Sequence, residues 1–179
     1  MYSRPFVGAN CKICTTLHHL IMKGLAYYPS PVGDLKITSL EDKITGIHFF
    51  DGEQLEPNVT PVIQECINEL DAYFYQGRKF FTVDIAMSGS SFQQKVWNEL
   101  LTIPYGKTLS YFDLALRTGD INNVRAVGHA NGENPFAIIV PCHRVIGKNG
   151  DLVGYAGGID KKMWLLQHEG AFSEQLKLF

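Results

Sequence analysis

The spacing of apolar residues changes along this 179-residue chain, and the changes limit the folds that it can adopt. Between Leu25 and Phe50, apolar and polar residues alternate in short runs broken by turn residues, which indicates strands and hairpins. Over residues 58–76, apolar residues recur every three or four positions, as in an amphipathic helix that ends at Gly77. Residues 80–85 alternate again and predict one more strand. The first half therefore predicts a small antiparallel sheet with one helix.

A small, polar segment, Met87–Ser91, separates this region from one in which strand patterns nearly vanish. Ser90 or Ser91, with Gln93 or Gln94 three residues later, predicts a capping box at the start of a helix. The apolar stripe of this helix consists of Phe92, Val96, Trp97, Leu100 and Leu101. The second half is therefore predicted to be mainly helical.

Two shorter helices are predicted further on. Ser110 with Asp113 begins one that stops at Gly119, and the next covers residues 124–131. Such a pair matches the helix-turn-helix plan, in which the second helix lies against DNA, although most such pairs are ordinary helical hairpins. The DNA interpretation is favoured by the cation Arg125 and by small residues that let the helix backbone approach a surface. The small residues are Ala126, Gly128 and Ala130.

Composition excludes several classes of protein. Hydrophobic residues make up 45% of the chain, which indicates a globular protein rather than a disordered one. No apolar run approaches the roughly 18 residues of a membrane span, and the start lacks an export signal, so we expect a cytoplasmic protein, or a nuclear one in a eukaryote, without membrane contact. The formal charge of −2 argues against a general polycation, so any nucleic-acid contact is local and falls in the slightly basic half, residues 92–179.

Three of the four cysteines are assigned no chemistry. Cys66 occupies an apolar position of a helical pattern, as a small buried hydrophobe does. Cys11 and Cys14, with His18 and His19, have the side chains of a zinc site, but the second cysteine pair of a strong zinc motif is missing. We therefore expect free thiols and no metal.

The candidate chemistry lies where an apolar run ends. Residues 137–140 predict a buried strand that stops at Pro141, whose fixed φ would aim the thiol of Cys142. A thiol with an ordinary pKa of about 8.5 needs a proton acceptor before it can attack. His143 follows directly, and one ordered water could carry the proton to it. Glu169, at the end of another helical stretch, is the kind of carboxylate that orients an imidazole.

Five segments of the second half form a set. They are Arg125-Ala-Val-Gly128, Asn134-Pro135, Ile139-Val-Pro-Cys-His-Arg-Val145, Gly154-Tyr-Ala-Gly-Gly158 and Trp164-Leu-Leu-Gln-His-Glu-Gly170. Together they closely resemble the O6-alkylguanine-DNA alkyltransferases, and the Pro-Cys-His-Arg-Val core is highly specific to that family. The resemblance implies a ribonuclease-H-like α/β domain at residues 24–88 and a mainly α domain with a winged or helix-turn-helix DNA-binding element at residues 89–179. Residues 1–23 form a tail outside the resemblance.

The resemblance also implies a role for each matched catalytic residue. Cys142 corresponds to the alkyl acceptor, His143 to its water-mediated base and Glu169 to the partner of that base. Asn134 corresponds to the asparagine that braces the active-site turn. Tyr111 corresponds to the tyrosine that donates to the guanine ring as the alkyl group leaves.

The substrate-holding residues follow in the same way. Arg125 corresponds to the arginine that fills the gap left by the flipped nucleotide and keeps the duplex from closing. Ala156 stands where some members have serine, so we expect an altered alkyl-group preference. The implied DNA contacts are Val124, Ala126, Gly128 and Tyr111, and the implied walls and lid of the nucleotide pocket are Val145, Ile146, Tyr155, Ala156, Gly157 and Gly158.

The function implied is irreversible, single-turnover transfer of the alkyl group from O6-alkylguanine, and from O4-alkylthymine, to Cys142 in double-stranded DNA approached from the minor groove. Water does not convert a thioether back to a thiol, so each molecule acts once and needs no cofactor, and we expect a monomer. Two alternatives stay open. A DNA-binding regulator would keep Cys142 as a buried or redox-sensing thiol. A hydrolase or acyltransferase would use the same cysteine, histidine and glutamate for repeated turnover.

Overall fold

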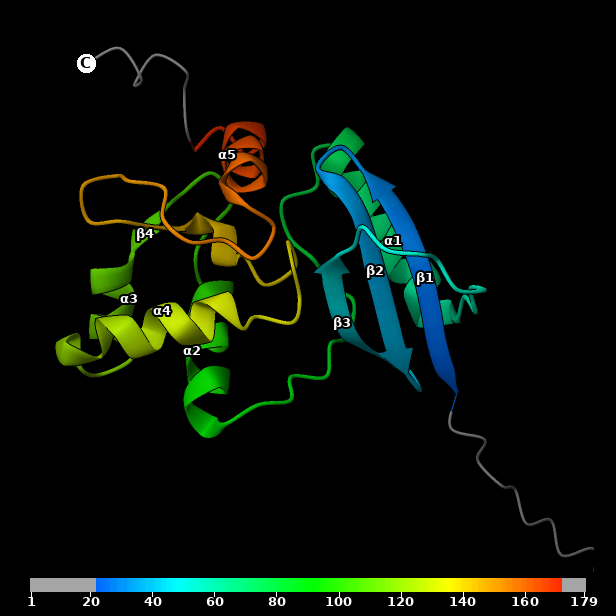
Figure 1. Ribbon diagram of the computed structural model, residues 1–179, viewed down its shortest axis with the longest axis horizontal. Coiled ribbons are helices and arrows are strands. Elements are labelled where there is room, and N and C mark those ends of the chain that lie inside the picture. The colour runs from blue at the N-terminus through cyan, green and yellow to red at the C-terminus, as the bar shows by residue number, and fades with distance from the viewer. Residues whose placement is uncertain (1–21, 172–179) are drawn as a thin grey trace, which may run out of the picture.

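The computed structural model describes residues 22–171, in which a sheet with one helix lies beside a group of short helices (Figure 1). Strands β1 (Lys23–Ser30), β2 (Gly33–Leu40) and β3 (Lys43–Phe49) form an antiparallel sheet in the order β1-β2-β3. Helix α1 (Pro61–Tyr75) packs on this sheet (Figure 1). The sheet and helix predicted from the first half are confirmed.

The alternating residues of the strands form the core beneath α1. Leu35 and Ile37 of β2 and Ile44 and Ile47 of β3 are fully buried. The helix begins at Pro61 rather than near residue 58, because Asn58 exchanges two backbone hydrogen bonds with Leu25 of β1, at 2.8 and 2.9 Å, and so extends the sheet. A proline at the first helical position loses no helical hydrogen bond, which suits this start.

The strand predicted over residues 80–85 is wrong. Of this segment, Ile85 makes an isolated bridge to Ile44. The backbone N–H groups of Thr82 and Val83 donate to the carboxylate of Glu69 instead, at 2.9 and 3.2 Å. Because a side chain satisfies these donors, the segment runs as irregular chain from α1 toward the second half.

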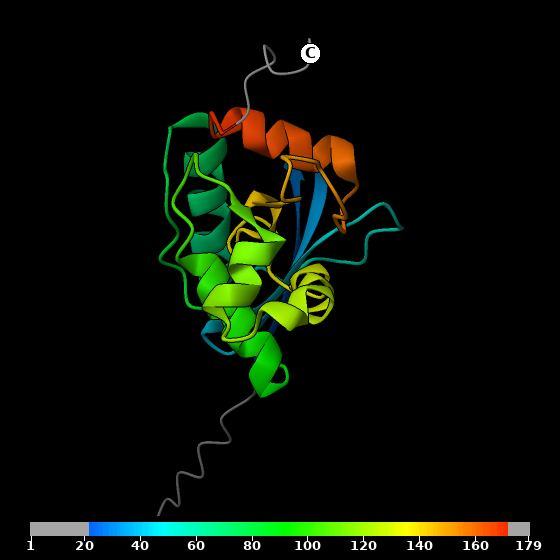
Figure 2. The ribbon, with the colours of Figure 1, turned by 90° about the vertical axis from the view of Figure 1, so that its left-hand side faces the viewer.

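The second half is mainly helical, as predicted. Its elements are α2 (Ser91–Leu101), β4 (Leu109–Ser110), α3 (Tyr111–Arg117), the 3-10 turn η1 (Ile121–Asn123), α4 (Val124–Gly132), the 3-10 turn η2 (Cys142–Arg144), β5 (Val145–Ile146) and α5 (Ile159–His168). Helix α5 lies across one end of the molecule (Figure 2). Its Trp164 and His168 contact the ring of Phe74 in α1. Within residues 22–171, no helix combines the length and apolar character needed to cross a bilayer.

Capping residues fix where two of these helices begin. Ser90 accepts from the N–H of Gln93 at 3.3 Å, and the Gln93 side chain accepts from the N–H of Ser90 at 2.7 Å, so the capping box of α2 is confirmed. Ser110 likewise accepts from the N–H of Asp113 at 3.0 Å and begins α3. Leu101 departs from the predicted stripe, because at the last residue of α2 its side chain is 46% exposed.

The apolar run 137–140 is buried, but the predicted strand is wrong. The run forms a compact turn in which Val140 donates to the carbonyl of Phe136 at 3.0 Å. Ile138 has a φ of 73°, a conformation that β-branched residues rarely adopt. Burial and hydrogen bonding therefore hold this turn in a shape that its own residues do not favour.

Replacing Ser90 with alanine should lower the free energy of unfolding by about 1 kcal/mol, because an orphan N–H of α2 loses its acceptor. Urea unfolding followed by circular dichroism measures the change. Ser88→Ala, at an exposed position before the helix, is the matched control and should leave stability unchanged. Equal stability of the two variants would contradict the capping role.

Candidate active site

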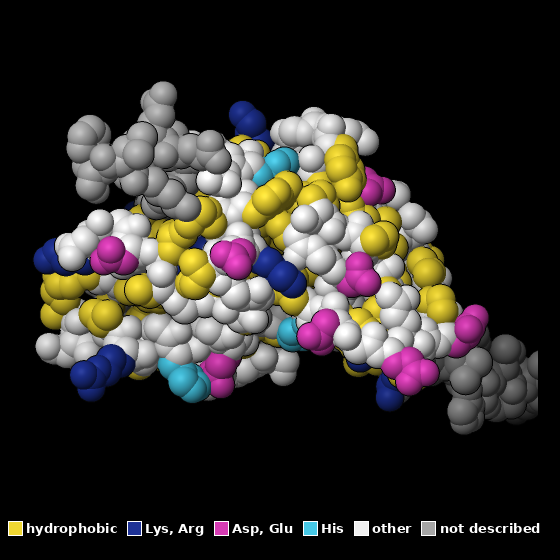
Figure 3. All heavy atoms as spheres, turned by 45° about the horizontal axis from the view of Figure 1, so that its top comes forward, with side chains coloured by type: hydrophobic (Ala, Val, Ile, Leu, Met, Phe, Trp, Pro, Cys, Tyr) yellow, Lys and Arg dark blue, Asp and Glu magenta, His cyan; other side chains and the backbone are white. Residues whose placement is uncertain are grey.

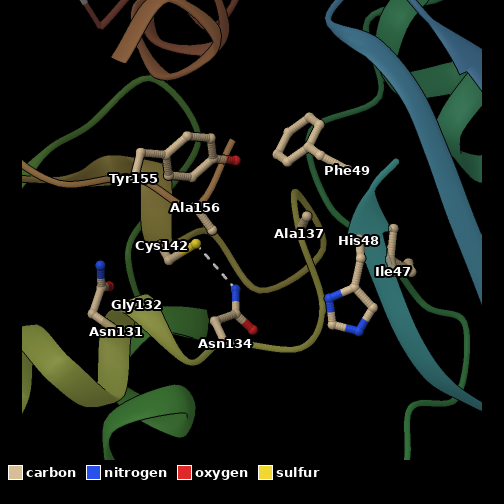
Figure 4. A pocket seen from close by; sticks show the side chains of 10 residues that line it. All are labelled: Ile47, His48, Phe49, Asn131, Gly132, Asn134, Ala137, Cys142, Tyr155 and Ala156. Atoms are coloured by element: carbon tan, nitrogen blue, oxygen red, sulfur yellow. Dashed lines mark hydrogen bonds between the residues drawn. The ribbon is translucent and has the colours of Figure 1, made fainter. Parts of the chain in front are cut away.

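Cys142 begins the turn η2 and lines a cavity of about 130 Å³. Its backbone N–H donates to Val140 at 2.8 Å, and its Sγ accepts from the Nδ2 of Asn134 at 3.1 Å (Figure 4). The residue is 6% exposed, so the sulfur lies inside the protein surface. A substrate atom must therefore enter the cavity to reach it.

Asn134 connects the sulfur to the turn that precedes it. Its Nδ2 also donates to the carbonyls of Val140 at 2.8 Å and Phe136 at 3.3 Å, and its Oδ1 accepts from the N–H of Phe136 at 3.0 Å. The amide is buried. One side chain thus fixes both ends of the 137–140 turn and the direction of Cys142.

The carboxylate of Glu169 is the centre of a buried hydrogen-bond network. It faces Nε2 of His143 at 2.9 Å and accepts from Nε and Nη2 of Arg144 at 2.8 and 2.9 Å. The hydroxyl of Tyr73 in α1 donates at 2.9 Å, and the N–H of Gly106 donates at 3.3 Å. Four segments of the chain therefore meet at one charge.

These contacts set the protonation states of the site. Burial alone would raise the pKa of Glu169, but the hydrogen bonds from His143 and Arg144 outweigh it and hold that pKa at about 2. Burial lowers the pKa of His143 more than Glu169 raises it, so the imidazole is neutral. An ionised Glu169 requires the proton on Nε2, which leaves Nδ1 as an acceptor. Nδ1 is buried and has no hydrogen-bond partner within residues 22–171.

The thiol is also neutral at rest. Burial raises the pKa of Cys142, while the hydrogen bond from Asn134 and the charge of Lys162 act in the opposite direction. Lys162 is itself buried and donates from Nζ to the carbonyls of Val153 at 2.9 Å and Gly154 at 3.4 Å. Sulfur attack therefore needs a base, and the free Nδ1 of His143 is a candidate.

The predicted DNA-side residues lie on α3 and α4. The hydroxyl of Tyr111 accepts from Asn131 at 3.3 Å and is 3.4 Å from the carbonyl of Val153. Arg125 is exposed near the start of α4, and Gly128 faces the Tyr111 ring, which would be 3.9 Å from an added Cβ. A shallow surface hollow joins Tyr111, Val124, Arg125, Gly128 and Val153. Ala126 is exposed on the same helix.

The helical half offers the less acidic surface to a nucleic acid. In Figure 3, acidic side chains gather over the sheet half of the visible face. Residues 92–179 carry nine basic and eight acidic side chains, against seven and ten in residues 1–91. A polyanion is therefore attracted more to the half that carries α3 and α4.

The predicted walls and lid divide into two groups. Tyr155 and Ala156 line the cavity of Cys142, and the hydroxyl of Tyr155 is buried without a partner in the part of the chain described. Gly157 and Gly158 follow them at the start of α5. Val145 and Ile146 form β5, which pairs with β4, and lie outside the lining of this cavity.

Several residues at the site were missed by sequence reasoning. Tyr73 falls in the apolar pattern of α1 and looks like an ordinary core residue. Lys162, in α5, looks like an ordinary surface cation in the sequence. The cavity is also lined by residues from β3, from α4 and from the turn before Cys142, which no local motif marks as cavity residues. These are Ile47, His48, Phe49, Asn131, Gly132 and Ala137.

The candidate metal ligands cannot be placed, because Cys11, Cys14, His18 and His19 lie outside the described residues. The part of the chain that is described contains no group of three or more side chains able to hold a metal ion. Cys66 is a free, fully buried thiol in α1, as its helical position predicts.

Comparisons with known proteins agree across both halves. Residues 25–87 match the family model for the ribonuclease-like domain of 6-O-methylguanine DNA methyltransferase, and residues 91–171 match that for its DNA-binding domain. The Mycobacterium leprae methylated-DNA–protein-cysteine methyltransferase is 42% identical over 146 residues, which cover 78% of this chain and 88% of the relative.

Solved structures give the same result. The crystal structure of Mycobacterium tuberculosis O6-methylguanine methyltransferase superposes with a TM-score of 0.75 at 39% identity, covering 88% of this chain and 99% of that one. The Mycobacterium tuberculosis OGT crystallised in complex with DNA gives a TM-score of 0.74 at 41% identity, covering 81% and 91%.

Replacing Glu169 with glutamine should lower the free energy of unfolding at pH 7 by about 3 kcal/mol, because Arg144 keeps its charge but loses its buried counterion. The folded-state pKa of about 2 lies below the roughly 4.3 of an unfolded glutamate, so the advantage of wild type is complete above about pH 5 and is lost as the pH falls toward 2.

Urea unfolding at pH 7 and pH 3 measures this difference between wild type and variant. Glu65→Gln, at an exposed position of α1, is the control and should show no comparable loss. A Glu169→Gln deficit that stays constant between the two pH values would contradict the depressed pKa.

Proposed function

This chain belongs to the O6-methylguanine DNA methyltransferase family, and we propose from that membership that Cys142 is the residue that receives the alkyl group. Its activity is that of a methylated-DNA–protein-cysteine methyltransferase, which repairs O6-alkylguanine in DNA. The observation that supports Cys142 is its place in a cavity with Asn134 on the sulfur and the acceptor nitrogen of a neutral His143 in the next residue. Cys66, by contrast, is enclosed in the core beneath α1.

The proposed transfer exchanges one bond for another. As the thiol proton passes through a bridging water to Nδ1 of His143, Sγ of Cys142 bonds to the alkyl carbon and the bond between that carbon and O6 breaks. The electron pair of the broken bond stays on the guanine. Glu169 stabilises the imidazolium that forms, and the hydroxyl of Tyr111 donates to the guanine ring as negative charge develops there.

The product explains why each molecule acts once. The new thioether joins two carbons through sulfur, and the site offers no route by which water would release the thiol. Repair is therefore stoichiometric, and the reaction consumes no cofactor. This differs from a cysteine hydrolase, whose acyl-enzyme is opened by water in every cycle.

Access to the lesion requires a flipped nucleotide, because the alkyl carbon is inside the base stack. The thin helix α4 enters the minor groove, and Arg125 takes the place of the flipped base. The partner is thus duplex DNA carrying O6-alkylguanine, with O4-alkylthymine as a second substrate, in whichever compartment holds the DNA. A monomer suffices, because one chain supplies the residues proposed for every step.

Ala156 lines the cavity at a position where a serine would offer a hydroxyl donor. The substrate oxygen must then find its donors among backbone N–H groups of the glycine-rich turn at residues 154–158. We expect this difference to alter the alkyl-group preference and to leave the reaction itself intact.

Mixing the protein with a duplex that contains one O6-methylguanine should add one methyl group to Cys142 and then stop. Intact-protein and peptide mass spectrometry follow the modification. Cys142→Ser should abolish it, whereas Cys66→Ala should still take up one methyl group per molecule. Many demethylated duplexes per molecule would indicate a turnover enzyme, and binding without modification would indicate a DNA-binding regulator.

Arg125→Ala should slow methyl transfer from duplex DNA about tenfold, a loss of about 1.4 kcal/mol in transition-state stabilisation, because the flipped state loses its wedge. Transfer from the free base O6-methylguanine needs no flipping and should be largely unchanged. Single-turnover rates on both substrates test this. Arg117→Ala removes another exposed cation, from the end of α3, and serves as the control. Equal losses on duplex and free base would contradict the wedge role.

A further inference from the structure

The cavity beside Cys142 is built from both halves of the molecule. Figure 4 shows Asn131 and Gly132 of α4 on one side, the end of β3 on the other, and the sulfur of Cys142 between them. In the proposed function the base enters from the α4 side, so it meets the sulfur before it reaches β3. Any alkyl group longer than methyl then extends toward β3, whose contributing residues are Ile47, His48 and Phe49.

The end of β3 is fixed relative to the active-site turn. The N–H of Ile47 donates to the carbonyl of Pro135 at 2.8 Å, and the N–H of Ala137 donates to the carbonyl of Ile47 at 2.9 Å. The side chain of Ile47 is fully buried. Because these bonds join the strand directly to the turn before Cys142, the strand cannot move away from the sulfur without breaking them.

The ring of Phe49 is held in place by the lid. It lies edge-on to Tyr155, with ring centroids 5.7 Å apart and planes at 71°. A Cβ added to Gly157 would be 2.5 Å from this ring, so only glycine leaves room for the phenyl group there. The ammonium of Lys161 also lies 4.5 Å from the centroid of the Phe49 ring. Contacts with three lid and helix residues therefore determine where the ring stands.

The size of the cavity makes the position of the Phe49 ring important for alkyl groups larger than methyl. An apolar cavity of roughly 150 Å³ accepts one benzene molecule, and the cavity here measures about 130 Å³. A methyl group fits easily, whereas a benzyl group fills the space and meets its far wall. Ala137 and Ala156 are small and Ile47 is fully buried, so Phe49 is the largest apolar side chain on the β3 side.

We propose that Phe49 sets the upper size limit of the alkyl group that Cys142 can accept, so that the N-terminal sheet takes part in substrate selection. This inference rests on the proposed function, since it concerns the group transferred to Cys142. Phe49 acts by steric exclusion: a smaller side chain enlarges the cavity toward β3, and a larger one shortens it. Methyl transfer itself makes little use of that space.

The test compares two duplexes, one with O6-methylguanine and one with O6-benzylguanine, in single-turnover reactions of the full chain followed by protein mass. Phe49→Ala should raise the ratio of benzyl to methyl transfer rates at least fivefold, and Phe49→Trp should lower it. Phe50→Ala is the matched control, because Phe50 is the next residue but packs on Tyr27, with ring centroids 5.0 Å apart, and should leave the ratio unchanged.

Other outcomes overturn the proposal. An unchanged ratio in Phe49→Ala means that the ring is not the limiting wall. A parallel fall of both rates means that Phe49 only supports the lid at Tyr155.

Phe49→Leu repeats the comparison with a smaller loss of packing if the alanine variant does not fold. If wild type transfers methyl to Cys142 but the Phe49 variants keep the wild-type ratio, only the size selection by Phe49 is wrong. If wild type transfers neither group, the proposed function fails as well.

Discussion

The buried carboxylate of Glu169 is the interaction on which the rest of the site depends. A charge removed from water is costly unless it is paired and hydrogen-bonded, and this one is satisfied by His143, Arg144, Tyr73 and Gly106 together. These residues belong to η2, α1 and the loop before β4, and Glu169 itself ends α5. Satisfying one charge therefore brings four distant segments together, and the orientation of the His143 ring follows from it.

Burial also keeps the resting site unreactive. Burial raises the pKa of Cys142 and lowers that of His143, so a neutral thiol stands near a neutral imidazole. A thiolate exposed to solvent would be open to oxidation. In the proposed function, a sulfur that reacts once gains from staying protonated and enclosed until an alkylated base occupies the cavity. The hydrogen bond from Asn134 then favours the thiolate as it forms.

The two halves of the molecule are joined at the site rather than merely linked by chain. Tyr73 of α1 hydrogen-bonds to the carboxylate of Glu169, and Ile47 of β3 hydrogen-bonds to the turn before Cys142. The N-terminal sheet is thus part of the environment of the sulfur, although every residue of the matched catalytic motifs lies in the second half. The predicted domain boundaries at residues 23/24 and 88/89 stay predictions, because contacts of this kind cross between the halves.

The sequence by itself determined the features that are encoded locally. Alternation along β1 to β3, the period of α1 and the serine caps of α2 and α3 depend on neighbours a few residues away, and the motifs around Cys142 pointed to the family. Tertiary structure decided the rest. The apolar run at residues 137–140 predicts burial, but it does not determine whether the backbone hydrogen bonds form a strand pair or a turn. For residues 80–85, the carboxylate of Glu69 accepts the hydrogen bonds that a neighbouring strand was expected to accept. Phe49 and Tyr73 reach the site only because the sheet packs against the helices, and the residues next to them in the sequence do not predict that contact.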